Sequence, residues 1–137
     1  MHWMLMPLRR YADFSGRSRR REYWMFVLFN LLLATAFWAL IGFVMLVLYV
    51  ADASETAMMA VFIPLVFAYS LAVLALMIPG VAVTVRRLHD LDKSGWTLLL
   101  ALIPLIGAIV LLVFYCTEGT RGPNRFGPDP KGQGAVA

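Results

Sequence analysis

The sequence contains few charged residues. It has twelve Lys or Arg and eight Asp or Glu in 137 residues, and 61% of its residues are hydrophobic. Soluble domains average about 25% charged and about 45–50% apolar residues. The composition therefore excludes a disordered chain and argues against a soluble globular domain. The length corresponds to one domain.

Cysteine and histidine are also scarce. The single cysteine, Cys116, excludes an intrachain disulfide, and we interpret it as a small hydrophobic residue at the end of an apolar run. The only histidines are His2 and His89, and a zinc site needs three or four convergent ligands. The nearest acidic helpers, Asp92 and Asp129, match no zinc spacing. We expect no metal and no cofactor.

Three long stretches carry no charge, and they cover residues 23–50, 57–85 and 96–116. Apolar runs of 18 or more residues predict membrane-spanning helices. The first two would each be roughly 42 Å long, which exceeds the roughly 30 Å hydrocarbon core and requires tilting. The predicted fold is an all-α integral membrane protein with two long transmembrane helices and a third apolar segment.

The expected organisation is linear along the chain. Residues 1–22 form a basic N-terminal segment, and residues 23–116 form a membrane domain that includes a cytoplasmic loop at 86–95. Residues 117–137 form a tail rich in Gly and Pro, in which we expect Gly119–Pro130 to be ordered and Lys131–Ala137 to be loose.

The third apolar segment has two interpretations. Its length favours one straight span, whereas Pro104 and Gly107 near its middle favour a helical hairpin, because proline breaks a helix and glycine permits chain reversal. A hairpin would return the tail to the cytoplasm. The charge distribution favours this second interpretation, and we prefer it.

Basic residues predict the orientation. Six lie before the first apolar run, none in Ala51–Thr56, three in Arg86–Gly95 and three after Cys116. Because basic residues stay on the cytoplasmic side, we expect the N-terminus to be cytoplasmic. A straight third span would leave nine basic residues inside and three outside, whereas a hairpin would place all twelve inside.

Aromatic and acidic residues mark the predicted ends of the spans. Tyr23, Trp24 and Trp96 are expected as anchors at the cytoplasmic interface. On the other side, Asp52 and Glu55 have the spacing of a helix start before the second span.

Four polar motifs separate or interrupt the apolar runs. They are residues 11–24, Arg86–Asp90 followed by Ser94-Gly95-Trp96, Ile103–Gly107, and Gly119–Pro130. In this order and spacing they resemble the domain of unknown function 805 family, the YhaH-like bacterial inner-membrane proteins. Leu91 and Asp92 depart from the family's Thr-Gly-like pair, and Arg121 stands where Pro is common. The resemblance implies a bacterial inner-membrane protein and no known activity.

The candidate functional residues form a polar cluster on the cytoplasmic face. Glu22 is expected to pair with Arg86 or Arg87, which share its membrane depth, or with Arg19 one helical turn earlier. For the same reason Asp90 is expected near the N-terminal arginines, and it is also expected to pair with a local arginine, while His89 caps the helix end. The full candidate set is Arg17, Arg20, Glu22, Arg86, Arg87, His89, Asp90, Asn124, Arg125 and Asp129.

Three functions remain open from the sequence. We prefer a non-enzymatic subunit, scaffold or lipid-interacting factor that acts through this face, where Arg17–Arg21 can meet anionic headgroups. An oligomeric transporter or channel component is the alternative, although no span carries the charge that usually marks an ion path. A membrane-surface enzyme using His89 and Asp90 is the second alternative, but adjacent helix residues do not share a face.

The expected partners follow from the same features. They are membrane lipids, with anionic headgroups in particular, and a second copy of the chain or another membrane protein. Nucleic acid is excluded because the basic run abuts a membrane span and no nucleic-acid motif accompanies it.

Overall fold

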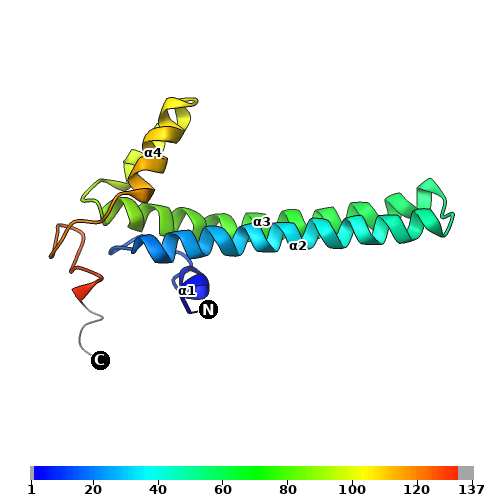
Figure 1. Ribbon diagram of the computed structural model, residues 1–137, viewed down its shortest axis with the longest axis horizontal. Coiled ribbons are helices and arrows are strands. Elements are labelled where there is room, and N and C mark those ends of the chain that lie inside the picture. The colour runs from blue at the N-terminus through cyan, green and yellow to red at the C-terminus, as the bar shows by residue number, and fades with distance from the viewer. Residues whose placement is uncertain (1, 133–137) are drawn as a thin grey trace. The chain divides into compact units, whose positions relative to one another are not determined.

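The computed structural model describes residues 2–132 and is helical throughout its ordered elements. The elements are α1 (His2–Arg9), α2 (Arg20–Val50), α3 (Glu55–His89), the 3₁₀ helix η1 (Gly95–Leu102) and α4 (Ile106–Cys116), as Figure 1 shows. The expectation of a loose end at Lys131–Ala137 falls mostly on residues 133–137, which lie outside the described part of the chain.

The two predicted membrane helices are present, with different limits. Both α2 and α3 are long and apolar enough to cross a membrane. Helix α2 begins at Arg20, before the apolar run starts, and α3 continues to His89. Arg86–His89 are therefore helical, which corrects the predicted loop at 86–95. The helix can continue through Arg86 and Arg87 because both side chains are fully buried and bonded.

Helix α2 is terminated by an aspartate in the connection to α3. Asp52 has a left-handed backbone (φ 53°), and the Ala53 amide donates to the Leu48 carbonyl at 3.0 Å, which is a Schellman motif. Helix α3 is capped by Ser54, whose Oγ accepts a hydrogen bond from the Ala57 amide at 3.3 Å. The predicted cap at Asp52 is therefore wrong, because Asp52 terminates the preceding helix.

Helix α3 ends in the same way. Asp92 has φ 56°, and the Lys93 amide donates to the Leu88 carbonyl at 3.0 Å. This is a position where glycine or asparagine is usual. Asp92 thus occupies the left-handed site that a glycine would fill without strain.

The third apolar segment folds as a hairpin, so the single straight helix is wrong. Helices η1 and α4 pack against each other, and the chain reverses at residues 103–105, as Figure 1 shows. The eight residues of η1 rise about 16 Å and the eleven residues of α4 about 17 Å, because a 3₁₀ helix rises faster per residue. The two limbs therefore match in length, and each reaches about half of a bilayer core.

A tight turn closes this hairpin. Leu105 has φ 63° and ψ −60°, and the Ile106 amide donates to the Pro104 carbonyl at 2.7 Å, which is the geometry of a γ-turn. At Gly107 an added Cβ would lie 1.7 Å from the Leu100 carbonyl oxygen. Only glycine permits this close approach of the two limbs.

The structure divides into two compact units, and these differ from the three consecutive segments expected from the sequence. Unit 1 comprises the chain up to Val27 and from Ile78 onward, and unit 2 comprises Leu28–Met77. The N-terminal segment and the tail thus pack with the adjoining ends of α2 and α3 because buried polar contacts connect them. The core of unit 1 centres on Leu88, Leu111 and Tyr115.

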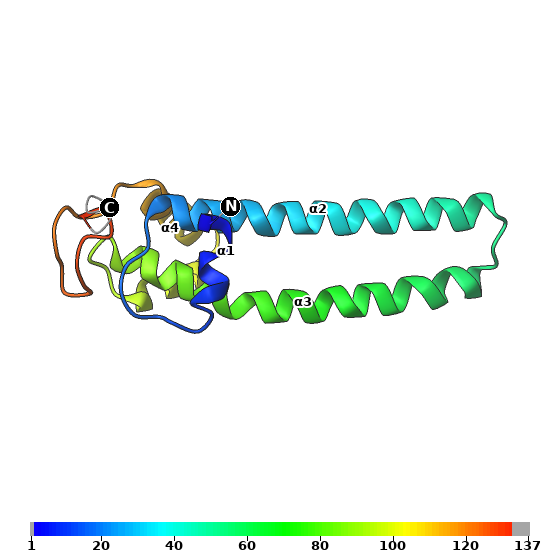
Figure 2. The ribbon, with the colours of Figure 1, turned by 90° about the horizontal axis from the view of Figure 1, so that it is seen from below.

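Unit 2 consists of two antiparallel helical segments joined by the short connection after Val50, as Figure 2 shows. Phe37 and Tyr69 stack across them with ring centroids 4.1 Å apart. Ile41 is the only buried residue of this unit, and its other apolar side chains are at least partly exposed. Helices that are apolar all round suit a lipid environment.

Candidate functional site

Six buried polar residues of unit 1 form the centre of the candidate site. We call this set the polar cluster; it comprises Arg17, Ser18, Glu22, Arg86, Arg87 and Asp90. They come from the segment before α2, from the first turn of α2, and from the last turn of α3 with the residue that follows it. Five of the six were candidates from the sequence, and only Ser18 was not.

Asp90 is clamped between two arginines. Its Oδ1 accepts from Arg17 Nε at 3.0 Å, and its Oδ2 accepts from Arg87 Nη1 at 2.6 Å. All three side chains are at most 6% exposed. The expected pairing of Asp90 with a local arginine is confirmed by Arg87. The contact with Arg17, 73 residues away, closes the clamp.

A second buried pair lies beside the clamp. Arg86 Nη2 donates to Glu22 Oε1 at 3.2 Å, and both side chains are at most 4% exposed. Arg86 Nε donates to Ser18 Oγ at 3.0 Å, and the Ser18 amide donates to the Arg86 carbonyl. The predicted Glu22–Arg86 pair is confirmed. Ion pairs buried this deeply require such additional hydrogen bonds to offset desolvation.

The remaining N–H groups of the clamp arginines donate hydrogen bonds to backbone carbonyls. Arg87 donates to the carbonyls of Phe114, Tyr115 and Thr117, and so caps the C-terminal end of α4. The last carbonyls of a helix have no partner within it, and a cation there also complements the helix dipole. The clamp therefore fixes the end of the hairpin as well as its own carboxylate.

Arg17 extends the same pattern to the tail. Its Nη1 donates to the Gly122 carbonyl at 2.7 Å, and its Nη2 donates to the Thr120 carbonyl at 2.6 Å. The Thr120 amide donates to the Asp90 carbonyl at 2.9 Å. The segment before α2, the end of α3 and the tail thus meet in one place.

Gly119 makes this meeting possible. A Cβ added there would lie 1.9 Å from Asp90 Oδ2. The tail backbone can approach the buried carboxylate only where no side chain intervenes. Gly119 was not a candidate site residue. The available signal was that it is the first residue of the Gly119–Pro130 motif.

His89 has a different role from the expected helix cap. Its ring stacks on Phe126, with centroids 3.9 Å apart and planes inclined by 4°. Its Nδ1 faces the Gly16 carbonyl at 3.2 Å, so this nitrogen carries the proton. The ring packs the tail and the N-terminal segment onto the end of α3 instead of bonding the helix carbonyls.

Two of the three tail candidates attach the tail to the end of α3, and the third stabilises the tail itself. Asn124 Nδ2 donates to the His89 carbonyl at 2.9 Å, and Arg125 pairs with Asp92 at 3.2 Å. Asp129 accepts hydrogen bonds from the Lys131 amide at 2.8 Å and the Gly122 amide at 3.0 Å, and these bonds lower its pKa. The expected ordered loop is confirmed, but Arg125 and Asp129 make no hydrogen bond to the arginines of the clamp among the described contacts.

The aromatic anchors differ in their surroundings. The Tyr23 ring contacts the Tyr115 ring, with centroids 4.6 Å apart and planes inclined by 33°, so Tyr23 packs within unit 1. Trp24 and Trp96 are exposed, Trp96 at 78%. Both indoles are available to an interface.

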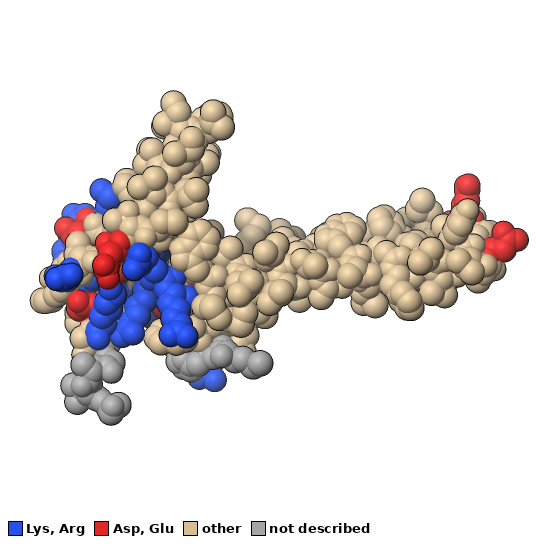
Figure 3. All heavy atoms as spheres, viewed as in Figure 1, with Lys and Arg blue, Asp and Glu red and all other residues tan. Residues whose placement is uncertain are grey.

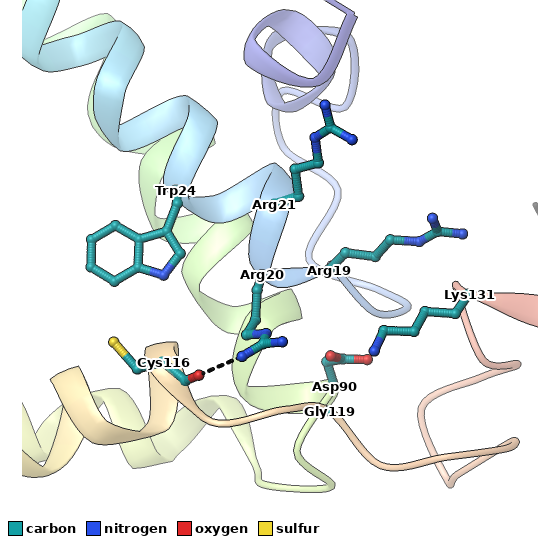
Figure 4. A pocket seen from close by; sticks show the side chains of 8 residues that line it. All are labelled: Arg19, Arg20, Arg21, Trp24, Asp90, Cys116, Gly119 and Lys131. Atoms are coloured by element: carbon teal, nitrogen blue, oxygen red, sulfur yellow. Dashed lines mark hydrogen bonds between the residues drawn. The ribbon is translucent and has the colours of Figure 1, made fainter.

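Basic residues that lie outside the clamp line an open pocket of about 590 Å³. Its lining residues, shown in Figure 4, are Arg19, Arg20, Arg21, Trp24, Asp90, Cys116, Gly119 and Lys131. Arg20 Nη1 donates to the Cys116 carbonyl at 3.0 Å. Figure 3 shows the Lys and Arg side chains of unit 1 gathered on the visible face, in contrast to the largely uncharged surface elsewhere.

One carboxylate accompanies these exposed cations. Glu118 Oε1 accepts a hydrogen bond from Lys131 Nζ and lies 4.0 Å from Arg20 Nη2. The Lys131 hydrogen bond and charge, together with the Arg20 charge, lower the pKa of Glu118. All three side chains are about half exposed.

The polar atoms of the cluster are satisfied by partners within the protein. Within residues 2–132 no buried side-chain nitrogen or oxygen lacks a hydrogen-bond partner. The same part of the chain contains no group of three or more His, Cys, Asp or Glu placed to hold a metal. Both oxygens of Asp90 are occupied by guanidinium groups, so the cluster acts as an internal clamp.

The comparison with known proteins agrees with this architecture. The model of a family described as "Protein of unknown function (DUF805)" matches residues 11–128. The chain belongs to this family. The matched range includes every residue of the polar cluster, the whole hairpin and the tail up to Pro128.

Two curated relatives extend the match to nearly the full length. Inner membrane protein YhaI of Escherichia coli K12 is 44% identical over 131 residues, which cover 96% of this chain and 97% of the relative. Inner membrane protein YhaH of the same organism is 42% identical over 132 residues, covering 96% and 98%. No solved structure matches the chain. The DUF805 chain described here is accordingly an inner-membrane protein, and its family has no established biochemical role.

Proposed function

We propose that the protein is a non-enzymatic, lipid-interacting factor of the inner membrane that acts through a cytoplasmic polar face. The clamp at Asp90 carries this proposal. Because its carboxylate and both of its arginines are committed to one another and to backbone carbonyls, the cluster has no free acid, base or nucleophile to offer a substrate. The groups that remain outward are mainly basic.

The same clamp supports a specific topology. Arg17 precedes α2, Asp90 follows α3, and Thr120 follows the hairpin, yet these residues are in direct contact. Segments that touch in a polar cluster lie on one side of a membrane. We therefore propose two full crossings by α2 and α3, a re-entrant hairpin of η1 and α4, and both the N-terminal segment and the tail in the cytoplasm, where all twelve basic residues obey the positive-inside rule.

Thiol labelling tests the topology. In a Cys116→Ser background, Ala53→Cys reports the connection between α2 and α3, and Gly132→Cys reports the tail. We expect a membrane-impermeant maleimide to label Ala53→Cys in intact cells and Gly132→Cys only after lysis. Labelling of Gly132→Cys in intact cells would refute the cytoplasmic tail and with it the cytoplasmic face.

Lipid analysis tests the function. The full chain is purified in a mild neutral detergent, and the lipids that remain bound are compared with those of the membrane from which it was extracted. We expect phosphatidylglycerol and cardiolipin to be enriched over phosphatidylethanolamine. Bound lipid with the composition of the bulk membrane would refute a lipid-interacting role.

A further inference from the structure

We propose that the pocket beside the polar cluster binds the phosphate group of an anionic phospholipid, and that Glu118 occupies the phosphate's place when no lipid is bound. This inference rests on the proposed lipid-interacting function and assigns it a site. The site is the pocket lined by Arg20, Trp24 and Lys131 among others, and its volume of about 590 Å³ is in the range of small-ligand sites.

The first support is the convergence of two cations. Arg20 comes from the start of α2 and Lys131 from the tail, and both interact with the same oxygen of Glu118. Two flexible basic side chains from distant parts of the chain can therefore close on one oxyanion. A phosphate offers more acceptor oxygens and more charge than a carboxylate, so it suits this pair better.

The second support is that Glu118 is an easily displaced occupant. Its side chain is 52% exposed, and exposed ion pairs contribute little to stability. By contrast, Asp90, the carboxylate that lines the pocket, is already neutralised by Arg17 and Arg87. Arg19 and Arg21 add positive charge to the lining of the same pocket. An anion that displaces Glu118 is therefore surrounded by basic side chains.

The third support concerns the source of the phosphate. Figure 4 shows the indole of Trp24 on the side of the pocket next to Cys116, while Arg20 extends from the first turn of the same helix and Lys131 from the tail. From Trp24 to Val50 helix α2 carries no charge, so the pocket lies where an apolar helix surface begins. Tryptophan and basic residues at such a boundary are the usual surroundings of a lipid headgroup.

Native mass spectrometry of the full chain in neutral detergent tests the site. The probes are cardiolipin, phosphatidylglycerol and phosphatidylcholine, each titrated separately, and the readout is the apparent Kd of the first bound lipid. Arg20→Gln/Lys131→Gln removes the two converging cations. Arg9→Gln/Arg125→Gln is the matched control, because it removes two exposed basic residues outside the pocket and lowers the net charge equally.

We expect wild type to bind the anionic lipids more tightly than phosphatidylcholine. The pocket variant should lose affinity for them by roughly thirtyfold, since each of the two cations that close on the phosphate contributes about a fivefold effect. The control should change by less than about fivefold. Glu118→Gln should bind about fivefold more tightly than wild type, because it frees both cations.

The remaining outcomes separate the possible failures. Equal affinity of wild type for all three lipids would refute the proposed function itself. A preference for anionic lipid that survives in the pocket variant, or is lost equally in the control, would refute only the site. Displacement of bound phosphatidylglycerol by millimolar inorganic phosphate would assign the pocket to a soluble anion and overturn the lipid. Weaker binding by Glu118→Gln would overturn its role as the occupant.

Discussion

The interactions that stabilise unit 1 internally differ in kind from those that stabilise unit 2 internally. Unit 1 buries six polar residues around two carboxylates, whereas unit 2 buries only Ile41 and contains no Lys or Arg. Apolar helices in lipid gain little from hydrophobic contact with each other, because the surrounding lipid is equally apolar. The contrast shows that specificity in this small membrane protein is concentrated in the polar cluster, where each group has one set of partners.

Removing the charge at the clamp should have the largest effect. Asp90→Asn leaves two buried guanidinium groups without their counter-ion, and breaking a buried pair typically costs about 3–5 kcal/mol. We expect a loss of this size in the free energy of unfolding, measured by denaturant titration in detergent.

Asp52→Asn is the matched control in unit 2. Asp52 lies in an exposed turn with φ 53°, a conformation that asparagine also adopts readily. It should change the unfolding free energy by less than about 0.5 kcal/mol. Equal effects of the two substitutions would show that the clamp does not stabilise unit 1.

Glycine substitution should sharpen the contrast. Gly107→Ala places a Cβ 1.7 Å from the Leu100 carbonyl oxygen and forces the hairpin limbs apart, at a cost of about 1–3 kcal/mol. In α2, an added Cβ at Gly42 meets nothing within 4 Å, so Gly42→Ala should be neutral or stabilise by up to about 1 kcal/mol. Thermal unfolding of both variants by tryptophan fluorescence measures the difference. A Gly107→Ala protein with the wild-type midpoint would contradict the close packing of η1 on α4.

The aromatic stack in unit 2 should matter less. Phe37→Leu removes the ring that stacks on Tyr69, and such pairs contribute about 0.5–1.5 kcal/mol. Phe43→Leu is the control, because Phe43 is 65% exposed within the chain and faces outward. Denaturant titration of both variants should show a loss only for Phe37→Leu. If both lose equally, the stack contributes nothing beyond apolar area.

The smallest effect is expected from acid. Hydrogen bonds from Ser15 and Arg10 lower the pKa of Asp13 from 3.8 to about 2. Because the folded-state pKa lies below the unfolded value, the ionised carboxylate stabilises the fold above pH 3.8. This contribution is lost as the pH falls from 3.8 through about 2. Asp13 is 38% exposed, so the effect should stay below about 1 kcal/mol.

Asp13→Asn is the test of this acid dependence. It should abolish that part of the pH dependence of unfolding and leave the remainder unchanged. A variant whose unfolding depends on pH over this range as steeply as wild type would exclude Asp13 as the group responsible.

The long helices and the hairpin could be predicted from the sequence. A charge-free run must be helical in lipid because its backbone groups need internal partners. Pro104 and Gly107 marked the reversal, since one breaks a helix and the other permits close approach. The Glu22–Arg86 pair also followed from a shared membrane depth, and its geometry is confirmed at 3.2 Å.

The sequence predicted the pairing of Asp90 with a local arginine and its proximity to the N-terminal arginines, but not which of those arginines would contact it. The tail contacts were not predicted, because they depend on the close approach of the tail backbone to Asp90 at Gly119. The 3₁₀ form of η1 has no signature in residue type, because its apolar residues would suit an α-helix equally well. The stacking of His89 on Phe126 likewise depends on how the tail folds back.

The reach of Arg17 has a consequence for the time course of biosynthesis. Arg17 and its acceptor Thr120 are 103 residues apart, so a ribosome making roughly 5–20 residues per second needs about 5–20 s to supply the second after the first. Asp90 is only 73 residues from Arg17, so it is made before Thr120. The ion pair between Arg17 and Asp90 can therefore form before the tail exists, and the tail then joins a pair that is already in place.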